Sequence, residues 1–410
     1  MKERTLYLTL KKAIQTFPAV VVTGPRQSGK TTLLKYAFGK THRFVSLENL
    51  DLRLRAKDDP LLFLEQYKPP VIIDEIQYVP ELLSYIKTKI DEDRKAGQWL
   101  LTGSQSFHLM SGITQSLAGR AAVLSLLPFS FAELKDNFNC TEDVDSLIKR
   151  SKDEINNNAD NKNFDISDIM LKGFYPEIAI NKLVDRQLWC DSYISTYLER
   201  DVRSISGIDD FHRFDIFLKI CATRTGQILN MSDMARDIGV SVPTVKRWLS
   251  ALESSYQIFL IYPYYRNMGK RFVKSPKLYF NDPAIASYLI GLNSKDSLLS
   301  SPSFGSLFET MVVSDFMKRF YHYGKKPPIY YFKTRDGLEV DMVIEEGKGL
   351  HLFEIKSAMT LTTKHSYSIS RAANDLGSYV RSSSIISLSD ESFPLKSDIY
   401  NFSWKNILSK

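Results

Sequence analysis

The stretch VVVTGPRQSGKTT, residues 20–32, decides how the first part of the chain folds. Its apolar beginning, Val20–Val22, predicts a buried strand, and the pattern G-x-x-x-x-G-K-T follows from Gly24 to Thr31. The next residues, Leu33–Ala37, favour a helix. A strand, a glycine-rich loop and a helix in this order are the context in which the pattern binds phosphate.

The residue types in this loop suit a triphosphate. Its backbone N–H groups are expected to point at the phosphates, helped by the positive end of the helix that follows. Gly24 and Gly29 permit the turn and the close approach to the ligand. Lys30 would reach the terminal phosphates, and the Thr31 hydroxyl would bind the Mg²⁺ that bridges them. The alternative is a strand–helix turn that binds nothing. The sequence predicts ATP and Mg²⁺ as ligands, with the nucleotide held by Gly24, Pro25, Arg26, Gln27, Ser28, Gly29, Lys30, Thr31 and Thr32.

A second apolar run, Val71–Ile73, ends in the carboxylates Asp74 and Glu75. Asp74 can hold the magnesium ion together with Thr31, and Glu75 can polarise the water that attacks the γ-phosphate. A strand end that merely happens to be acidic is the alternative. A third strand, residues 98–104, ends in polar residues, and Thr102, Ser104 and Gln105 are candidates for sensing the γ-phosphate. Of these, Ser104 completes the predicted nucleotide-binding set; a strand-end turn is the other interpretation.

Five segments together resemble a family of bacterial and archaeal AAA-type ATPases that carry a C-terminal domain of uncharacterised function. They are GPRQSGKTTLL (24–34), VIIDEIQ (71–77), LLTGSQS (100–106), LAGR (117–120) and LPFSFAEL (127–134). The resemblance covers nearly the whole chain and implies an ATPase core of the AAA+ branch over residues 1–135. In that setting Lys30, Glu75 and Arg120 become the candidate catalytic residues, with Arg120 sensing or stabilising the developing phosphate charge. A surface or interface arginine is the alternative for Arg120.

The middle of the chain begins with a polar, Asn-rich stretch, residues 136–165, which we expect to be a linker loop or a loosely held helical insertion. Residues 166–211 are expected to form a helical bridge or lid. Within it, Arg200, Asp201 and Arg203 could reach back to the nucleotide, or could form ion pairs on a solvated helix face.

Residues 212–275 have the pattern of a winged helix. A capped helix over 229–240 ends in a glycine turn, a helix capped by Ser241 follows, and residues 256–262 alternate into a strand before a basic hairpin. In a DNA-binding interpretation, Thr244, Lys246 and Arg247 approach a groove while Lys270 and Arg271 neutralise phosphates. The alternative is a module that packs on the ATPase as a lid or scaffold.

Residues 276–410 contain three expected strands, at 329–332, 339–344 and 351–356. They carry Asp341 and Glu354-x-Lys356, and Glu309 lies on a helix upstream, which resembles the PD-(D/E)xK nuclease pattern. The carboxylates could hold a divalent ion, and Lys356 could position or activate the attacking water. A sheet with incidental charges, or the same fold retained for binding without cleavage, is the alternative.

Composition limits the remaining choices. Of 410 residues, 43% are hydrophobic and 25% charged, which is typical of globular proteins, and the net charge of +7 is compatible with a nucleic-acid partner. Three cysteines are scattered without metal-ligand spacing, and no apolar run approaches the roughly 20 residues of a membrane span. We therefore expect a cytoplasmic α/β protein without a membrane partner. Duplex DNA, further copies of the chain, or another protein are the possible partners, and a nucleotide-dependent assembly switch is the alternative to a DNA-acting ATPase.

Overall fold

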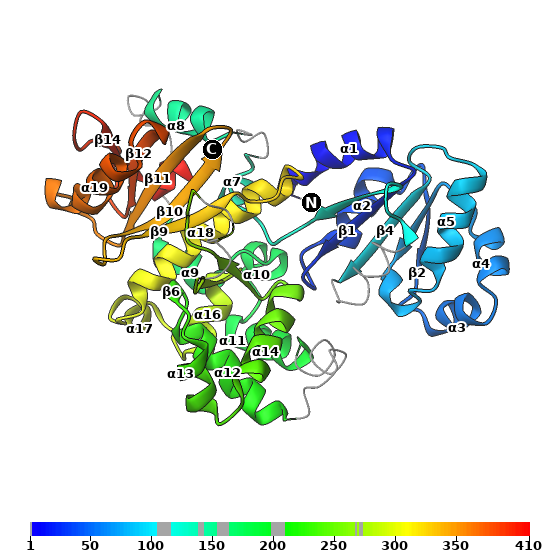
Figure 1. Ribbon diagram of the computed structural model, residues 1–410. Helices are drawn as coiled ribbons and strands as arrows, with labels where there is room; N and C mark the ends of the chain where they lie inside the picture. The colour runs from blue at the N-terminus through cyan, green and yellow to red at the C-terminus, as the bar shows by residue number, and fades with distance from the viewer. Residues whose placement is uncertain are drawn as a thin grey trace.

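The computed structural model describes residues 2–104, 116–137, 143–153, 164–197, 210–266, 269 and 274–410. Figure 1 shows an N-terminal part (blue to cyan), a helical middle part (green) and a C-terminal part (orange to red) that surround the long helix α18 (yellow).

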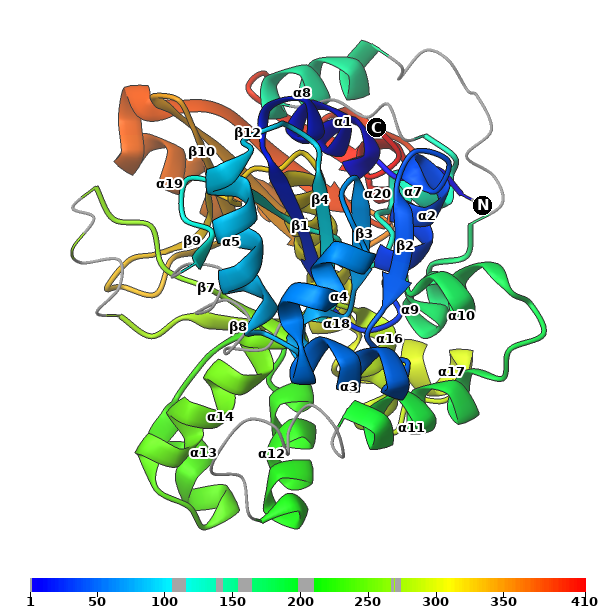
Figure 2. The ribbon, with the colours of Figure 1, turned by 90° about the vertical axis from the view of Figure 1, so that its right-hand side faces the viewer.

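Among the described residues, the N-terminal part is a parallel sheet with the strand order β2-β3-β4-β1-β5. Alternate residues of β1 face two different cores, with Val20 and Val22 packed against α1 and α2, and Val21 packed against α4 and α5. Figure 2 shows α3, α4 and α5 on the side of this sheet nearest the viewer. The elements are α1 (Leu6–Thr16), β1 (Ala19–Gly24), α2 (Lys30–Phe38), β2 (Arg43–Ser46), α3 (Leu50–Asp58), α4 (Pro60–Gln66), β3 (Val71–Asp74), α5 (Leu82–Glu92), β4 (Trp99–Ser104) and β5 (Ala121–Ser125).

The stretch that follows differs from the predicted loose insertion. After α7 (Phe131–Leu134), residues Val144–Asp153 form the helix α8, and Val144 and Leu147 are buried in the core. The Asn406 amide of α20 (Trp404–Ile407) donates to the Ser151 carbonyl at 3.1 Å. Four positions of this helix are buried, so α8 is packed more tightly than the expected loosely held helical insertion. The Asn-rich residues 154–163 lie outside the described residues.

The middle part is helical and carries a small antiparallel sheet in the order β6-β8-β7. Because β8 completes this sheet, the predicted boundary at residue 276 cuts through one structural unit. The predicted glycine turn is present, with Gly239 at φ 74° after α13, and Ser241 caps α14. The elements are α9 (Ile166–Lys172), α10 (Pro176–Ile180), α11 (Arg186–Tyr197), α12 (Phe211–Thr223), β6 (Gln227–Ile228), α13 (Met231–Ile238), α14 (Val242–Ser254), β7 (Ile258–Ile261), β8 (Lys277–Phe280), α16 (Pro283–Leu289) and α17 (Lys295–Leu299).

The C-terminal part contains a mixed sheet in the order β13-β14-β12-β11-β10-β9 among the described residues. The three predicted strands are present as the antiparallel set β9, β10 and β11. The sheet lies between α18, which shares the core of the middle part, and α19, which covers the other face. The elements are α18 (Phe304–His322), β9 (Ile329–Lys333), β10 (Glu339–Glu346), β11 (Gly349–Lys356), α19 (Tyr367–Leu376), β12 (Val380–Ser387), β13 (Phe393–Pro394) and β14 (Ile399–Ser403).

Helix α18 links all three parts of the molecule. Figure 1 shows it running from the C-terminal sheet toward α1. The Thr9 hydroxyl on α1 donates to the His322 carbonyl at the end of α18 at 3.1 Å. In the part of the chain that the structure describes, no helix is both long enough and apolar enough to cross a bilayer.

Candidate functional site

The predicted phosphate loop has the required backbone geometry. Gly24 and Gly29 have φ values of 145° and 94°, and a Cβ on Gly24 would lie 2.1 Å from the Leu126 carbonyl oxygen. Lys30 is 5% exposed, and its ammonium donates to the carbonyls of Gly24 at 3.0 Å and Pro25 at 2.8 Å. The ammonium is therefore held against the loop, at the start of α2.

Asp74 is held by three hydroxyls. Its Oδ1 accepts from Thr31 at 2.7 Å and from Thr102 at 2.6 Å, and its Oδ2 accepts from Ser46 at 3.1 Å. These residues come from α2, β4 and β2, and they meet because parallel strands end at one edge of a sheet. The sequence paired Thr31 with Asp74 correctly in space. It named Thr102 only as a phosphate sensor, whereas Thr102 binds the carboxylate.

Glu75 has an unusual backbone. Its φ of 58° lies in the left-handed region, which costs a non-glycine residue about 1–3 kcal/mol and is typical of functional positions. Its N–H donates to Thr102 Oγ1 at 3.1 Å. The Gln77 amide donates both to the Glu75 carboxylate and to Ser104 Oγ, the latter at 3.0 Å. Gln77 thus fixes Glu75, and the only indication of this role in the sequence is that the two residues are close neighbours.

Lys30, Thr31 and Glu75 line a cavity of about 480 Å³ whose other wall belongs to the middle part. The hydroxyl of Tyr193 on that wall lies 2.7 Å from the Tyr175 hydroxyl and accepts from the Gln257 amide at 3.0 Å. A second cavity, of about 340 Å³, adjoins the first at Gly29 and Pro176. This wall falls within the predicted bridge or lid, residues 166–211, but the residues that line the cavity were not predicted, because they lie some 150 residues further along the chain. The first cavity is lined by Arg26, Gln27, Gly29, Lys30, Thr31, Thr32, Glu48, Glu75, Pro176, Glu177, Tyr193 and Thr196.

The residues present fit a magnesium–triphosphate ligand. The Thr31 hydroxyl and the Asp74 carboxylate are adjacent oxygen donors, which are the ligands that Mg²⁺ prefers. Ser28 Oγ is buried in the loop without a hydrogen-bond partner among the described residues. A buried hydroxyl of this kind indicates that the loop can still form a hydrogen bond with a ligand.

Arg120 lies at the wrong edge of the sheet for the predicted role in its own chain. Its carbonyl accepts from the Ala19 N–H at the beginning of β1, whereas the phosphate loop follows the end of that strand. The guanidinium instead pairs with Asp91 at 2.6 and 2.9 Å. Arg120 therefore lies away from the phosphate loop of its own chain, and a role at the nucleotide of an adjacent chain stays a prediction. Gln105, Arg200, Asp201 and Arg203 lie outside the described residues.

A buried ion pair behind the phosphate loop was not predicted. Arg4 donates to the Ser28 carbonyl at 2.9 Å and to the Leu127 carbonyl at 2.6 Å, and its Nε lies 3.2 Å from Glu133. His322 of α18 lies 3.4 Å from the same carboxylate. Burial acts to raise the pKa of Glu133, but Arg4 and His322 hold this pKa well below its usual range. Through this group, the phosphate loop touches the C-terminal part.

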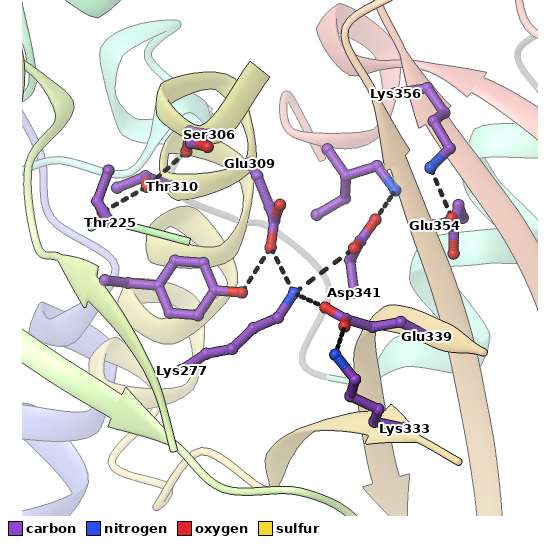
Figure 3. A network of polar contacts seen from close by, with 12 residues as sticks. Thr225, Lys277, Ser306, Glu309, Thr310, Lys333, Glu339, Asp341, Glu354 and Lys356 are labelled. Atoms are coloured by element: carbon purple, nitrogen blue, oxygen red, sulfur yellow. Dashed lines mark hydrogen bonds and ion pairs between the residues drawn. The ribbon is translucent and has the colours of Figure 1, made fainter. Parts of the chain in front are cut away.

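The four residues of the predicted nuclease-like pattern gather in one region (Figure 3). Asp341 accepts from the Ile355 N–H at 2.9 Å, and Lys356 lies 2.6 Å from Glu354. Burial and the neighbouring Asp341 raise the pKa of Glu309 to about 7 and that of Glu354 to about 8. Such shifts are typical of crowded carboxylates at functional sites.

An unpredicted lysine lies inside this group. The Lys277 ammonium is within 2.7 Å of Glu339, 3.2 Å of Glu309 and 3.6 Å of Asp341 (Figure 3). Burial acts against its charge, yet the carboxylates raise the pKa of Lys277. Nothing in the sequence between residues 276 and 280 indicated this contact, because β8 belongs to a different sheet.

The residues predicted to contact DNA are only partly described. Lys246 and Arg247 are exposed on α14, and Thr244 is half-buried near its beginning. Lys270 and Arg271 lie outside the described residues. Just after α14, the Tyr256 hydroxyl lies 3.0 Å from Thr23 Oγ1 and 2.8 Å from Ser125 Oγ, so the middle part contacts β1 and β5 directly.

Comparison with known proteins agrees with this geometry for the N-terminal part. Residues 16–135 match a family model described as an AAA domain, and residues 163–296 and 304–407 match two domains of unknown function (DUF8612 and DUF4143). The uncharacterised proteins Rv2008c of Mycobacterium tuberculosis and Mb2031c of Mycobacterium bovis are each 27% identical to the chain over 363 residues, which is 88% of this chain and 75% of the relative.

Two solved structures are more distant. The Walker-type ATPase paby2304 of Pyrococcus abyssi is 16% identical, with a TM-score of 0.45 over 70% of this chain and 96% of that chain. AMPPCP-bound DnaA of Aquifex aeolicus is 13% identical, with a TM-score of 0.26 over 62% of this chain and 88% of that chain. The family match, the loop geometry and the parallel sheet identify the N-terminal part as an AAA-type P-loop domain.

Proposed function

We propose that this protein is a magnesium-dependent ATPase whose P-loop domain acts on the parts that follow it. Lys30 and the backbone of the loop bind the phosphates, while Thr31 and Asp74 hold the magnesium ion. When bound, the ion neutralises charge on the β- and γ-phosphates. Glu75 orients and polarises the attacking water, and Thr102 and Gln77 hold Glu75 in place.

The convergence of Thr31, Asp74 and Glu75 at one sheet edge, beside Lys30, carries this proposal. The adjoining cavity of about 340 Å³ supports it, because apolar side chains that suit a nucleobase line it. They include Leu33, Phe129 and Ile180. We assign the triphosphate to the larger cavity and the base to the smaller one.

Steady-state ATP turnover and equilibrium nucleotide binding test the proposal on the full chain. Lys30→Ala should lose both, because the loop is left without its cation. Glu75→Gln should keep binding but lose turnover by about 10²–10⁴-fold, the usual contribution of a general base. Lys12→Ala, on the exposed side of α1, is the control and should behave as wild type. Unchanged turnover in Lys30→Ala and Glu75→Gln would refute the assignment.

A second proposal concerns what the ATPase acts on. The order α12-β6-α13-α14-β7-β8 supports a winged helix, in which Lys246 and Arg247 face solvent. The grouping of Glu309, Asp341, Glu354 and Lys356 supports a nuclease-like site beside it. We infer a DNA-associated module, with a protein-assembly switch as the alternative.

The two alternatives differ in their response to DNA. Duplex DNA should stimulate ATP turnover of the wild type, and Lys246→Ala/Arg247→Ala should lose this stimulation while retaining basal turnover. Glu65→Gln, a surface change in the P-loop domain, serves as the control. Turnover that is indifferent to DNA, with intact DNA after incubation with Mn²⁺, would favour the assembly switch.

A further inference from the structure

We propose that Lys277 is a built-in cation that competes with a divalent metal ion for the C-terminal carboxylates, so that the site is closed while β8 is in place. The inference rests on the nuclease-like site proposed above and concerns its regulation. No step of the ATPase proposal depends on it.

The position of the ammonium carries the argument. Lys277 is 2% exposed, and its ammonium contacts Glu339, Glu309 and Asp341 at 2.7, 3.2 and 3.6 Å. Figure 3 shows it between α18, which supplies Glu309, and β10, which supplies Asp341. A divalent ion bound by these carboxylates would need oxygen atoms at about 2.0–2.6 Å around the same point. The ammonium and the ion would repel each other there, so only one can be present.

A second observation indicates that these carboxylates can bind a cation of higher charge than an ammonium. Glu354 is 3% exposed, and its Oε2 has no hydrogen-bond partner among the described residues, while its Oε1 is held by Lys356. Leaving a buried carboxylate oxygen unbonded is costly unless a ligand can use it. The Lys277 ammonium satisfies Glu309 and Glu339 but makes no contact with Glu354, whereas a metal ion could bind both Asp341 and Glu354.

Lys277 belongs to a strand of the middle part, and this explains how the metal site could open. Its strand pairs with β6 and β7 of the middle part, with Ile261 opposite Lys277. The Tyr279 hydroxyl on the same strand donates to Glu309 at 2.6 Å. Because the lysine is buried, its ammonium can leave only if β8 moves relative to α18 and β10. The site would then bind metal only after the middle and C-terminal parts shift.

Binding of Mn²⁺ to the nucleotide-free full chain tests this inference. Lys277→Met should bind one additional Mn²⁺ per chain, or bind it roughly tenfold or more tightly than the wild type, because a charge has been removed from the site. Adding Asp341→Asn to Lys277→Met should abolish the gain. Lys333→Met is the matched control, because Lys333 pairs with Glu339 from an exposed position at 2.9 Å. Equal Mn²⁺ binding by wild type and folded Lys277→Met would overturn the inference.

A measurement on the wild type covers the case in which Lys277→Met does not fold. Amine labelling followed by mass spectrometry should find Lys277 protected without metal and more reactive at millimolar Mn²⁺, with Lys333 reactive throughout. Labelling of Lys277 that does not rise would contradict the competition. DNA cleavage and ATP turnover are measured on the same samples. Gained metal binding without cleavage would leave the competition standing and remove only the nuclease assignment.

Discussion

At the scale of single residues, Thr102 connects the Asp74 carboxylate to the backbone of Glu75, the two acidic residues that the proposed hydrolysis needs. It donates to Asp74 and accepts from the Glu75 N–H. Thr102→Val keeps the shape of the side chain and removes both hydrogen bonds. We therefore expect ATP turnover to fall by about 10–100-fold and the Mg²⁺ concentration needed for half-maximal turnover to rise. Steady-state turnover against Mg²⁺ concentration measures both. Thr88→Val, on the exposed face of α5, is the control. Wild-type turnover and Mg²⁺ dependence in Thr102→Val would show that the two bonds are dispensable.

A second residue-scale prediction concerns pH. Burial raises the pKa of Glu253, near the end of α14, to about 7. Because the unfolded chain ionises this group at about 4.5, the folded state is destabilised progressively as pH rises from about 4.5 to 7. Glu253→Gln should therefore be more stable than wild type at pH 8, by on the order of 3 kcal/mol at most, and similar to it near pH 4.5. Urea unfolding at both pH values measures this. A difference that does not depend on pH would contradict it.

The sequence predicted the site residues that lie within one motif and missed those that depend on tertiary contacts. Lys30, Thr31 and Asp74 carry their chemistry in short patterns next to strands, and the structure brings them together. Tyr193 and Lys277 face their sites from other domains, and no local pattern indicates such a contact. The resemblance alone suggested a nucleotide role for Arg120, and in this structure its side chain pairs with Asp91, as the alternative of a surface arginine allows.

At the scale of elements, the N-terminal segment is tied to α7 by the buried Arg4–Glu133 pair. Arg4→Met would leave the Glu133 carboxylate buried without its main counter-charge, so we expect a loss of about 3–5 kcal/mol in unfolding free energy. Adding Glu133→Gln should recover part of that loss, because no uncompensated charge remains. A double-mutant cycle in urea measures the coupling. Strictly additive effects of the two substitutions would show that the pair contributes nothing specific.

The elements themselves follow from local patterns, but their assembly does not. The apolar run at β1 and the cap at Ser241 predict a strand and a helix whose observed bounds differ by a residue or two. The burial of helix α8 was not predicted because its buried face is short and its other residues are polar. The boundary at residue 276 was misplaced because β8, which pairs with β7, was assigned to the next part of the chain.

At the scale of the whole molecule, Arg120 tests whether neighbouring chains share a site. Since its guanidinium pairs with Asp91 at the sheet edge away from the phosphate loop, we expect Arg120→Ala to keep ATP turnover within about twofold and to change stability little, because exposed ion pairs contribute little. Turnover per chain, measured over a range of protein concentrations, checks this. A large loss in Arg120→Ala, with wild-type turnover rising with concentration, would show that Arg120 completes the site of an adjacent chain.

The cores of the molecule predict how it unfolds. The two cores of the P-loop sheet are separate from the large core that extends from Phe129 to Leu408. We therefore expect two calorimetric transitions without nucleotide. The nucleotide cavity has walls from both bodies, with Lys30 on one and Tyr193 on the other. A non-hydrolysable ATP analogue with Mg²⁺, at 100 times its Kd, should stabilise the folded protein by about 2.7 kcal/mol. The midpoint temperatures of both transitions should rise, and the two increases together should amount to roughly 5–10 °C. Lys30→Ala should show neither shift. A shift confined to the P-loop transition would mean that the nucleotide does not engage the middle part.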